Sequence, residues 1–112
     1  MKLEIKNNCL IVHLQGELDS HYADKVRKNV DDTAERYGMK NIIIDMENVT
    51  FMDSSGIGFI VGRYKYAARR GGETIAAAAQ NSIKRLMVLS GLHRIIDIYD
   101  SLDDAVRKFE RR

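Results

Sequence analysis

The chain has 112 residues, of which 45% are hydrophobic and 30% charged, and its formal net charge is +2. This length suits one domain of ordinary size, and the composition is that of a folded protein and not of a disordered one. The small charge excess gives no reason to expect a nucleic-acid or membrane surface. The single cysteine, Cys9, excludes an internal disulfide and a Cys-x-x-Cys metal site.

Targeting and membrane signals are absent from the sequence pattern. The apolar runs are only a few residues long, whereas roughly 20 are needed to span a bilayer. The N-terminus alternates between apolar and polar residues and has no apolar signal-peptide core. We therefore expect a cytoplasmic protein without membrane insertion, built as a single domain over residues 1–112.

The first third of the sequence predicts a hairpin followed by a helix. Residues 3–6 and 9–16 flank an Asn-Asn turn, which indicates two antiparallel strands. The side chains expected to share the core face of the second strand are Leu10, Val12 and Leu14. Apolar residues at helical spacing predict a helix over residues 21–37, and Gly38 stands where a helix commonly ends.

The rest of the chain alternates between predicted strands and helices. A β-branched run at residues 41–46 predicts a strand buried on both faces, residues 47–53 a loop, and residues 54–70 a helix. The further elements expected are a strand at 74–79, a helix capped by Asn81 or Ser82 that ends at Gly91, a strand at 95–99 and a helix begun by Ser101.

This alternation predicts an α/β domain. The sheet is expected to be mixed but mostly parallel, with an N-terminal antiparallel hairpin and about four packed helices. Partners and ligands of such sheets meet the loops that follow the carboxyl ends of the strands. Attention therefore falls on residues 16–20, 47–58 and 79–82.

Candidate catalytic residues are few, and none forms a recognisable set. The three histidines lie far apart in sequence. His13 is expected on the strand face opposite the core, either packed or half-exposed. Glu17 and Asp19 are two carboxylates that could act in acid/base chemistry, but a solvated strand-to-helix loop is the favoured interpretation. The glycines of residues 56–62 match neither the dinucleotide fingerprint nor a Walker loop. We expect no catalytic residue, metal ligand or cofactor.

The segment Asp53-Ser54-Ser55-Gly56 places two hydroxyls and a carboxylate at a predicted helix start. Helix capping explains these residues without any function, because Asp and Ser accept hydrogen bonds from the free N–H groups there. The same position also suits a phosphoryl group on serine, because a helix N-terminus attracts anions.

A helical wheel for residues 54–70 separates two faces. The expected core face contains Ile57, Ile60, Val61, Tyr64, Ala67 and Ala68. A second stripe contains Ser54, Gly58, Gly62, Lys65 and Arg69. Each glycine inside a helix costs about 1 kcal/mol relative to alanine, and either close packing within the domain or docking of another protein's backbone can account for that cost.

Six segments, in this order and spacing, resemble the STAS-domain anti-sigma factor antagonists. They are Gly16-Glu17-Leu18-Asp19, Ile42-Ile43-Ile44-Asp45-Met46, Phe51-Met52-Asp53-Ser54-Ser55-Gly56-Ile57-Gly58, Gly62-Arg63-Tyr64-Lys65, Gly71-Gly72-Glu73 and Leu89-Ser90-Gly91-Leu92. The resemblance covers nearly the whole chain.

The resemblance implies a regulatory switch and not an enzyme. Family members, when unphosphorylated, bind an anti-sigma factor that is also a serine kinase, and so release the sporulation sigma factor. The kinase phosphorylates the first serine of the motif, and a PP2C-type phosphatase reverses the modification. On this chain the resemblance implies Ser54 as the phosphoacceptor and Ser55 as the neighbouring cap. The partner-binding residues it implies are Asp19, Asp53, Ser55, Gly56, Gly58 and Gly62.

Two other functions stay open at this stage. STAS-like folds also serve as modules in sensors, so a small-ligand or nucleotide-binding role is an alternative, which the missing phosphate-loop motifs oppose. Hydrolysis at Glu17 and Asp19 is a more remote one. Direct nucleic-acid binding lacks a basic face and interleaved aromatic residues.

Overall fold

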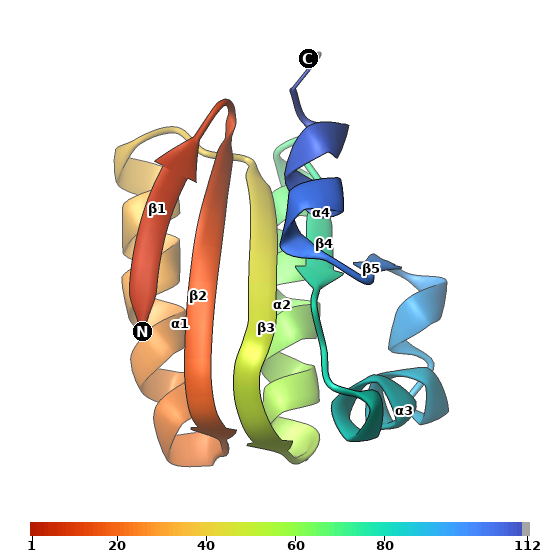
Figure 1. The fold of residues 1–112 in the computed structure, drawn as a ribbon. Coiled ribbons are helices and arrows are strands. Elements are labelled where there is room, and N and C mark those ends of the chain that lie inside the picture. The colour runs from red at the N-terminus through yellow and green to blue at the C-terminus, as the bar shows by residue number, and fades with distance from the viewer. Residues whose placement is uncertain (111–112) are drawn as a thin grey trace.

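A five-stranded sheet in the order β1-β2-β3-β4-β5 forms the centre of the molecule (Figure 1). This computed structural model describes residues 1–110. The strands are β1 Lys2–Lys6, β2 Cys9–Leu18, β3 Asn41–Met52, β4 Thr74–Ala77 and β5 Asp97–Tyr99. Strands β1 and β2 are antiparallel, whereas β2 to β5 are parallel to their neighbours. The mixed α/β sheet with an N-terminal antiparallel pair is confirmed.

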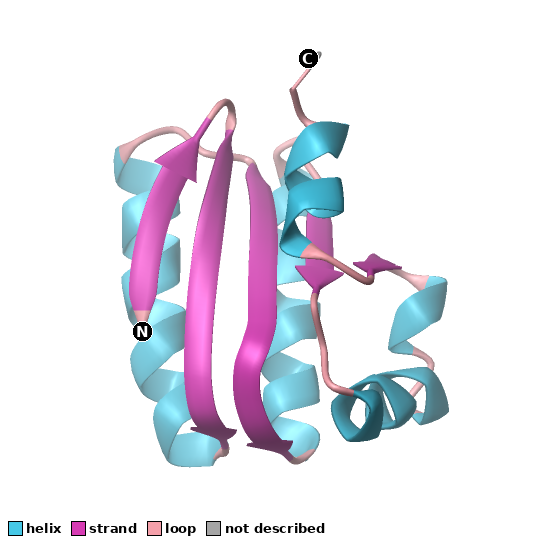
Figure 2. Ribbon diagram, in the orientation of Figure 1, coloured by secondary structure: helices cyan, strands magenta, loops and turns pink. Residues whose placement is uncertain are grey.

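Helices cover both faces of this sheet (Figure 2). They are α1 Ser20–Arg36, α2 Ser54–Arg69, α3 Asn81–Leu89 and α4 Leu102–Lys108, with a 3-10 turn at Leu92–Arg94. Helices α1 and α2 lie side by side behind the sheet, and α4 lies on the opposite face (Figure 1). Within residues 1–110, no helix combines the length and the apolar character needed to cross a bilayer.

Alternating strand residues feed two separate cores, as a period of two requires. Leu10, Val12 and Leu14 join the larger core between the sheet and α1, α2 and α3, as predicted. Cys9 and Ile11 point to the other face and pack in a smaller core with α4. The sheet is therefore buried on both faces along its centre, which explains the continuous apolar run at the start of β3.

Strand β3 is twice as long as predicted, and the loop expected at residues 47–53 is wrong. The strand continues to Met52 because β2 and β3 stay paired through two register shifts, one after His13 and one after Gly16. At each shift β3 carries one residue more than β2, as in a β-bulge. The bulges break the alternation and expose polar residues at 47, 48 and 50, which makes a strand look like a loop.

Smaller boundary errors have local causes. The strand expected at 74–79 ends at Ala77, because Ala78 adopts a left-handed conformation with φ of 62°. The strand expected at 95–99 begins at Asp97, after the 3-10 turn. Helix α3 has Gln80 at its N-cap without a side-chain cap, so the expectation that Asn81 or Ser82 caps it is wrong.

The buried face of α2 is rotated toward α1 relative to the helical wheel. Phe59 and Arg63 are buried, whereas Ala68, expected in the core, is exposed. Arg63 is tolerated there because its guanidinium forms an ion pair with Asp31 of α1, at 3.0 Å from Nε to Oδ1, and lies over the Phe59 ring. Burial lowers the pKa of Arg63, and the Asp31 charge opposes this shift. A pattern that counts only apolar residues misses such a pair.

Just after α2, the backbone at Gly72 passes very close to the backbone that precedes β3. Gly71 has φ of 75°, which suits glycine after a helix, and Gly72 follows it. A Cβ atom on Gly72 would overlap the backbone carbonyl of Lys40, the residue just before β3. Only glycine fits at position 72, so the end of α2 is held directly against the start of its neighbouring strand.

Candidate functional site

Helix α2 begins at the carboxyl end of β3, where Asp53 forms its N-cap. The backbone of Asp53 is extended, with φ of −115° and ψ of −166°, and its carboxylate accepts a hydrogen bond of 2.8 Å from the Ser55 N–H. Asp53 is therefore the cap, and the expectation that Ser55 caps the helix is wrong. Asp53 was also expected to contact a partner, and its side chain is half-buried in this capping role.

Ser54 is the first residue of α2 and is exposed. Its hydroxyl makes no hydrogen bond with any residue of the described range 1–110. The next N–H groups are already engaged, because those of Gly56 and Ile57 both donate to the Asp53 carbonyl. The Ser54 hydroxyl is thus exposed and unbonded within the described residues, at a helix end whose dipole favours an added negative charge.

The junction between β2 and α1 lies beside the junction between β3 and α2, because Leu18 at the end of β2 pairs with Met52 at the end of β3. The next residue, Asp19, caps α1 and accepts a hydrogen bond of 3.0 Å from the Tyr22 N–H. Asp19 is half-buried, and Ser20 after it is exposed. The sheet therefore brings Asp19 and Asp53 to one edge, as the sequence predicted.

The three glycines of the predicted partner surface differ in their surroundings. Gly56 is buried, and a Cβ there would overlap Met52 and approach Leu18 Cδ2 to 3.1 Å. Gly56 thus serves packing within the domain, and its burial removes it from the accessible surface. A Cβ at Gly58 or Gly62 would meet no atom within 4 Å. Packing within the domain therefore does not account for Gly58 and Gly62.

A hollow of about 240 Å³ separates the first halves of α1 and α2. Asp24 and Arg27 of α1 line one side, and Ser55 and Gly58 of α2 line the other. Its volume is below the range of about 300–1,000 Å³ typical of small-molecule sites. The hollow therefore gives no support to a small-molecule site.

The family model for the STAS domain matches residues 1–105. The chain is 39% identical to the anti-sigma F factor antagonist of Paenibacillus polymyxa, over 98% of this chain and 94% of the relative. The chain belongs to the STAS-domain anti-sigma factor antagonists. It is also 32% identical to the anti-sigma-B factor antagonist of Bacillus subtilis, over 81% of this chain and 82% of that protein.

Solved structures of SpoIIAA, an anti-sigma factor antagonist, share the fold of this antagonist. The unphosphorylated form superposes with a TM-score of 0.86, at 25% identity, covering 99% of this chain and 96% of that one. The phosphorylated form from Bacillus gives 0.75, at 26% identity and 96% of both chains. Anti-sigma factor antagonists are regulators without enzymatic activity.

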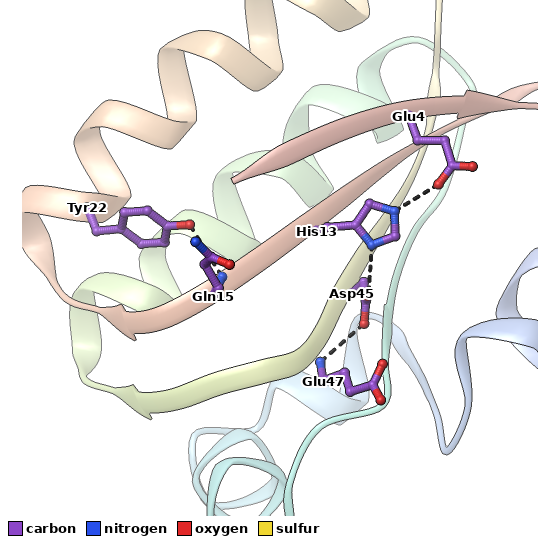
Figure 3. A network of polar contacts seen from close by, with 6 residues as sticks. All are labelled: Glu4, His13, Gln15, Tyr22, Asp45 and Glu47. Atoms are coloured by element: carbon purple, nitrogen blue, oxygen red, sulfur yellow. Dashed lines mark hydrogen bonds and ion pairs between the residues drawn. The ribbon is translucent and has the colours of Figure 1, made fainter.

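On the face of the sheet away from α1 and α2, His13 bridges two carboxylates, an arrangement that the sequence did not predict (Figure 3). We call it the histidine bridge. His13 is half-exposed, as expected, and its Nδ1 lies 2.6 Å from Asp45 Oδ2, while its Nε2 lies 2.8 Å from Glu4 Oε1. Burial alone lowers the pKa of His13, but the hydrogen bonds with the two carboxylates outweigh it, so the pKa is raised. The register that pairs His13 with Asp45 is the signal that would reveal the bridge.

Glu17 and Asp19, the two carboxylates considered for acid/base chemistry, have different surroundings. Glu17 is exposed on β2 beside Phe51, whereas the Asp19 carboxylate is engaged as a helix cap. Among residues 1–110, no three His, Cys, Asp or Glu side chains are grouped so as to hold a metal ion. Burial raises the pKa of the Cys9 thiol to about 11, so this cysteine stays protonated near neutral pH.

Proposed function

We propose that this antagonist, when unphosphorylated, binds an anti-sigma factor that is also a serine kinase and thereby releases a sporulation sigma factor. Phosphorylation of Ser54 ends the binding, and a PP2C-type phosphatase restores it. The observation that carries this proposal is the exposed, unbonded Ser54 hydroxyl at the head of α2. SpoIIAA, which shares the fold, exists in an unphosphorylated and a phosphorylated form. In this proposal, binding, phosphorylation and dephosphorylation take place in the cytoplasm.

The docking surface that we propose runs along the outer face of α2. Ser54, Gly58, Lys65 and Arg69 are exposed on this face and Gly62 is half-buried. With open space above both glycines, a partner's backbone can approach α2 closely. Each glycine lowers helix stability by about 1 kcal/mol, a cost that close contact with a partner would offset. Asp19, Asp53 and Ser55 border the surface at its Ser54 end.

Phosphate acts here by its position. A dianion on Ser54 would stand in the interface, where it loses water and meets the partner's groups without a matching cation. The two helix caps at this edge, Asp19 and Asp53, both carry carboxylates. Neither cap therefore supplies a positive charge that could balance the phosphate. Docking is opposed locally, without a change in the shape of the domain.

The choice of the anti-sigma factor that we propose as partner rests on sequence identity to two relatives. The anti-sigma F antagonist is 39% identical to this chain and the anti-sigma-B antagonist 32%. We therefore expect the anti-sigma F factor to be the preferred partner. A direct comparison of the affinities for anti-sigma F and anti-sigma-B factors tests this choice.

Phosphate transfer tests the site. The antagonist is incubated with ATP and the anti-sigma F factor of Paenibacillus polymyxa, and the peptide spanning residues 52–65 is examined by mass spectrometry. We expect one phosphate on Ser54, and none on a Ser54→Ala variant that still binds the anti-sigma factor. Ser55→Ala is the matched control and should be phosphorylated like the wild type. Stoichiometric phosphorylation of Ser54→Ala would refute the site.

A further inference from the structure

The α3 unit, defined as residues 81–96, combines exposed apolar side chains with positive charge. Val88, Leu89 and Ile95 are 44%, 77% and 42% exposed, and they are three of the seven large apolar residues exposed within the described range. The unit contains no acidic residue. Of its cations, Lys84 pairs with Asp100 at 2.9 Å, whereas the guanidinium groups of Arg85 and Arg94 form no ion pair with residues 1–110.

This unit borders helix α2. Its buried side chains Ile83 and Met87 pack in the larger core, against which Val61 of α2 also packs. Ile95 and Tyr64 of α2 line a shared hollow of about 160 Å³. In Figure 1 α3 lies near the end of the sheet where β3 stops and α2 begins. The α3 unit therefore adjoins the side of α2 that carries Val61 and Tyr64.

The two flanks of α2 differ in character. On one flank, the exposed residues of α1 are all polar or charged: Ser20, His21, Asp24, Lys25, Arg27, Lys28, Asn29, Asp32, Glu35 and Arg36. On the other flank, the α3 unit offers Leu, Val and Ile. The central parts of protein interfaces are apolar and depleted of charge. Of these two flanks, only the α3 side offers exposed large apolar side chains among the described residues.

We propose that the anti-sigma factor docked on α2 extends onto the α3 unit, placing an apolar patch over Leu89 and acidic side chains opposite Arg85 and Arg94. This inference rests on the proposed function and specifies the partner's chemistry. A standard interface covers about 800 Å² per partner, so a partner seated on α2 is expected to contact neighbouring elements as well. Charge complementarity selects the acidic rim, since the unit carries positive charge alone.

Other occupants fit the unit less well. A symmetric contact with a second copy would bring Arg85 and Arg94 of two chains together, and like charges oppose it. Binding to an anionic membrane relies on clusters of about four to eight basic residues, whereas this unit has three, one of them already paired. The acidic protein surface is the remaining match.

The test measures the affinity of the full chain for the anti-sigma F factor of Paenibacillus polymyxa by calorimetry. We expect Leu89→Ser to weaken binding about tenfold and Arg85→Glu about threefold to tenfold, the latter effect shrinking at high salt. Tyr37→Ser, which removes a side chain 54% exposed at the end of α1, is the matched control and should change affinity less than twofold. Unchanged melting temperatures would show that the variants fold.

The outcomes separate the two proposals. If the wild type does not bind the anti-sigma factor, the proposed function fails. If it binds and both Leu89→Ser and Arg85→Glu bind equally well, only the α3 inference fails. Sedimentation of the free wild type as a dimer that Leu89→Ser dissociates would assign the surface to a second copy. Wild-type flotation with phosphatidylserine vesicles that Leu89→Ser abolishes would assign it to membranes, and either result overturns the inference.

Discussion

The two strand-to-helix junctions of this antagonist have nearly the same construction but different helices behind them. Leu18 and Met52 are paired, each is followed by an extended Asp that caps a helix, and each Asp is followed by an exposed Ser. Behind Ser20, α1 covers its outer face with polar side chains. Behind Ser54, α2 leaves open space over Gly58 and Gly62. The accessible backbone beside Ser54 therefore distinguishes the second junction, and we attribute the proposed docking to it and not to the serine alone.

The largest expected effect comes from placing a negative charge at each serine. Ser54→Asp should weaken binding to the anti-sigma factor about 100-fold or more, because a charge against an interface costs several kcal/mol. Ser20→Asp should weaken it less than about fivefold, since polar side chains keep a partner's backbone away from α1. Calorimetric titration of both variants measures the difference. Equal losses would show that the two junctions are equivalent.

A second test compares glycines within α2. Gly56→Ala should destabilise the fold by about 1–3 kcal/mol, because the new methyl overlaps Met52. Gly58→Ala should stabilise it by about 0.5–1 kcal/mol through helix propensity, while weakening binding to the anti-sigma factor. Urea unfolding and titration measure the two quantities. A Gly58→Ala variant that binds like the wild type would argue against close contact there.

Removal of either capping carboxylate should lower stability by a similar amount, because the two junctions are built alike. Asp19→Ala and Asp53→Ala each remove one side-chain acceptor from a helix start, and each should lower the free energy of unfolding by about 1 kcal/mol. Urea unfolding at neutral pH checks this. A loss confined to Asp53→Ala would mean that the β3–α2 junction is held more tightly than its neighbour.

The smallest effect should come from the histidine bridge, which leaves both junctions untouched. The pKa of His13 is raised on folding, so its contribution is complete below its unfolded value near 6.5 and is lost as pH rises through the folded value. The pKa of Glu4 is lowered, chiefly by its hydrogen bond to His13, so its contribution is lost as pH falls below about 4.5. Measured between pH 6 and pH 8, the free energy of unfolding should decline by less than about 1 kcal/mol.

A His13→Gln variant provides the control for that measurement. It should flatten the pH dependence and leave the affinity for the anti-sigma factor unchanged at pH 7. A decline as steep as that of the wild type would assign the titration to another group.

Regular patterns predicted most of this fold, and irregular pairing and polar burial escaped them. The alternation of elements and the helix start at Ser54 follow from local residue types. The second half of β3 does not, because bulges expose Glu47 and Thr50 on a strand. Arg63 escapes for another reason, since its burial depends on Asp31 across the helix pair.

The site was predictable to a similar extent. Asp53-Ser54 marks a helix start by its sequence, and the wheel places Gly58 on the outer stripe. The wheel cannot tell that Gly56 is enclosed and Gly58 open, because that depends on how Met52 folds under the helix. The histidine bridge likewise requires the register of strands 32 residues apart in the chain.

The glycine contacts at the two ends of α2 bear on how fast the antagonist can respond. Gly56 lies against Met52 at the start, and Gly72 lies against the Lys40 carbonyl just beyond the end. Close packing at both ends opposes a shift of α2 along its axis, so we expect the proposed switch at Ser54 to act without a rearrangement of the helix. Under the proposed function, the lifetime of each state would be set by the kinase and the phosphatase that add and remove the phosphate.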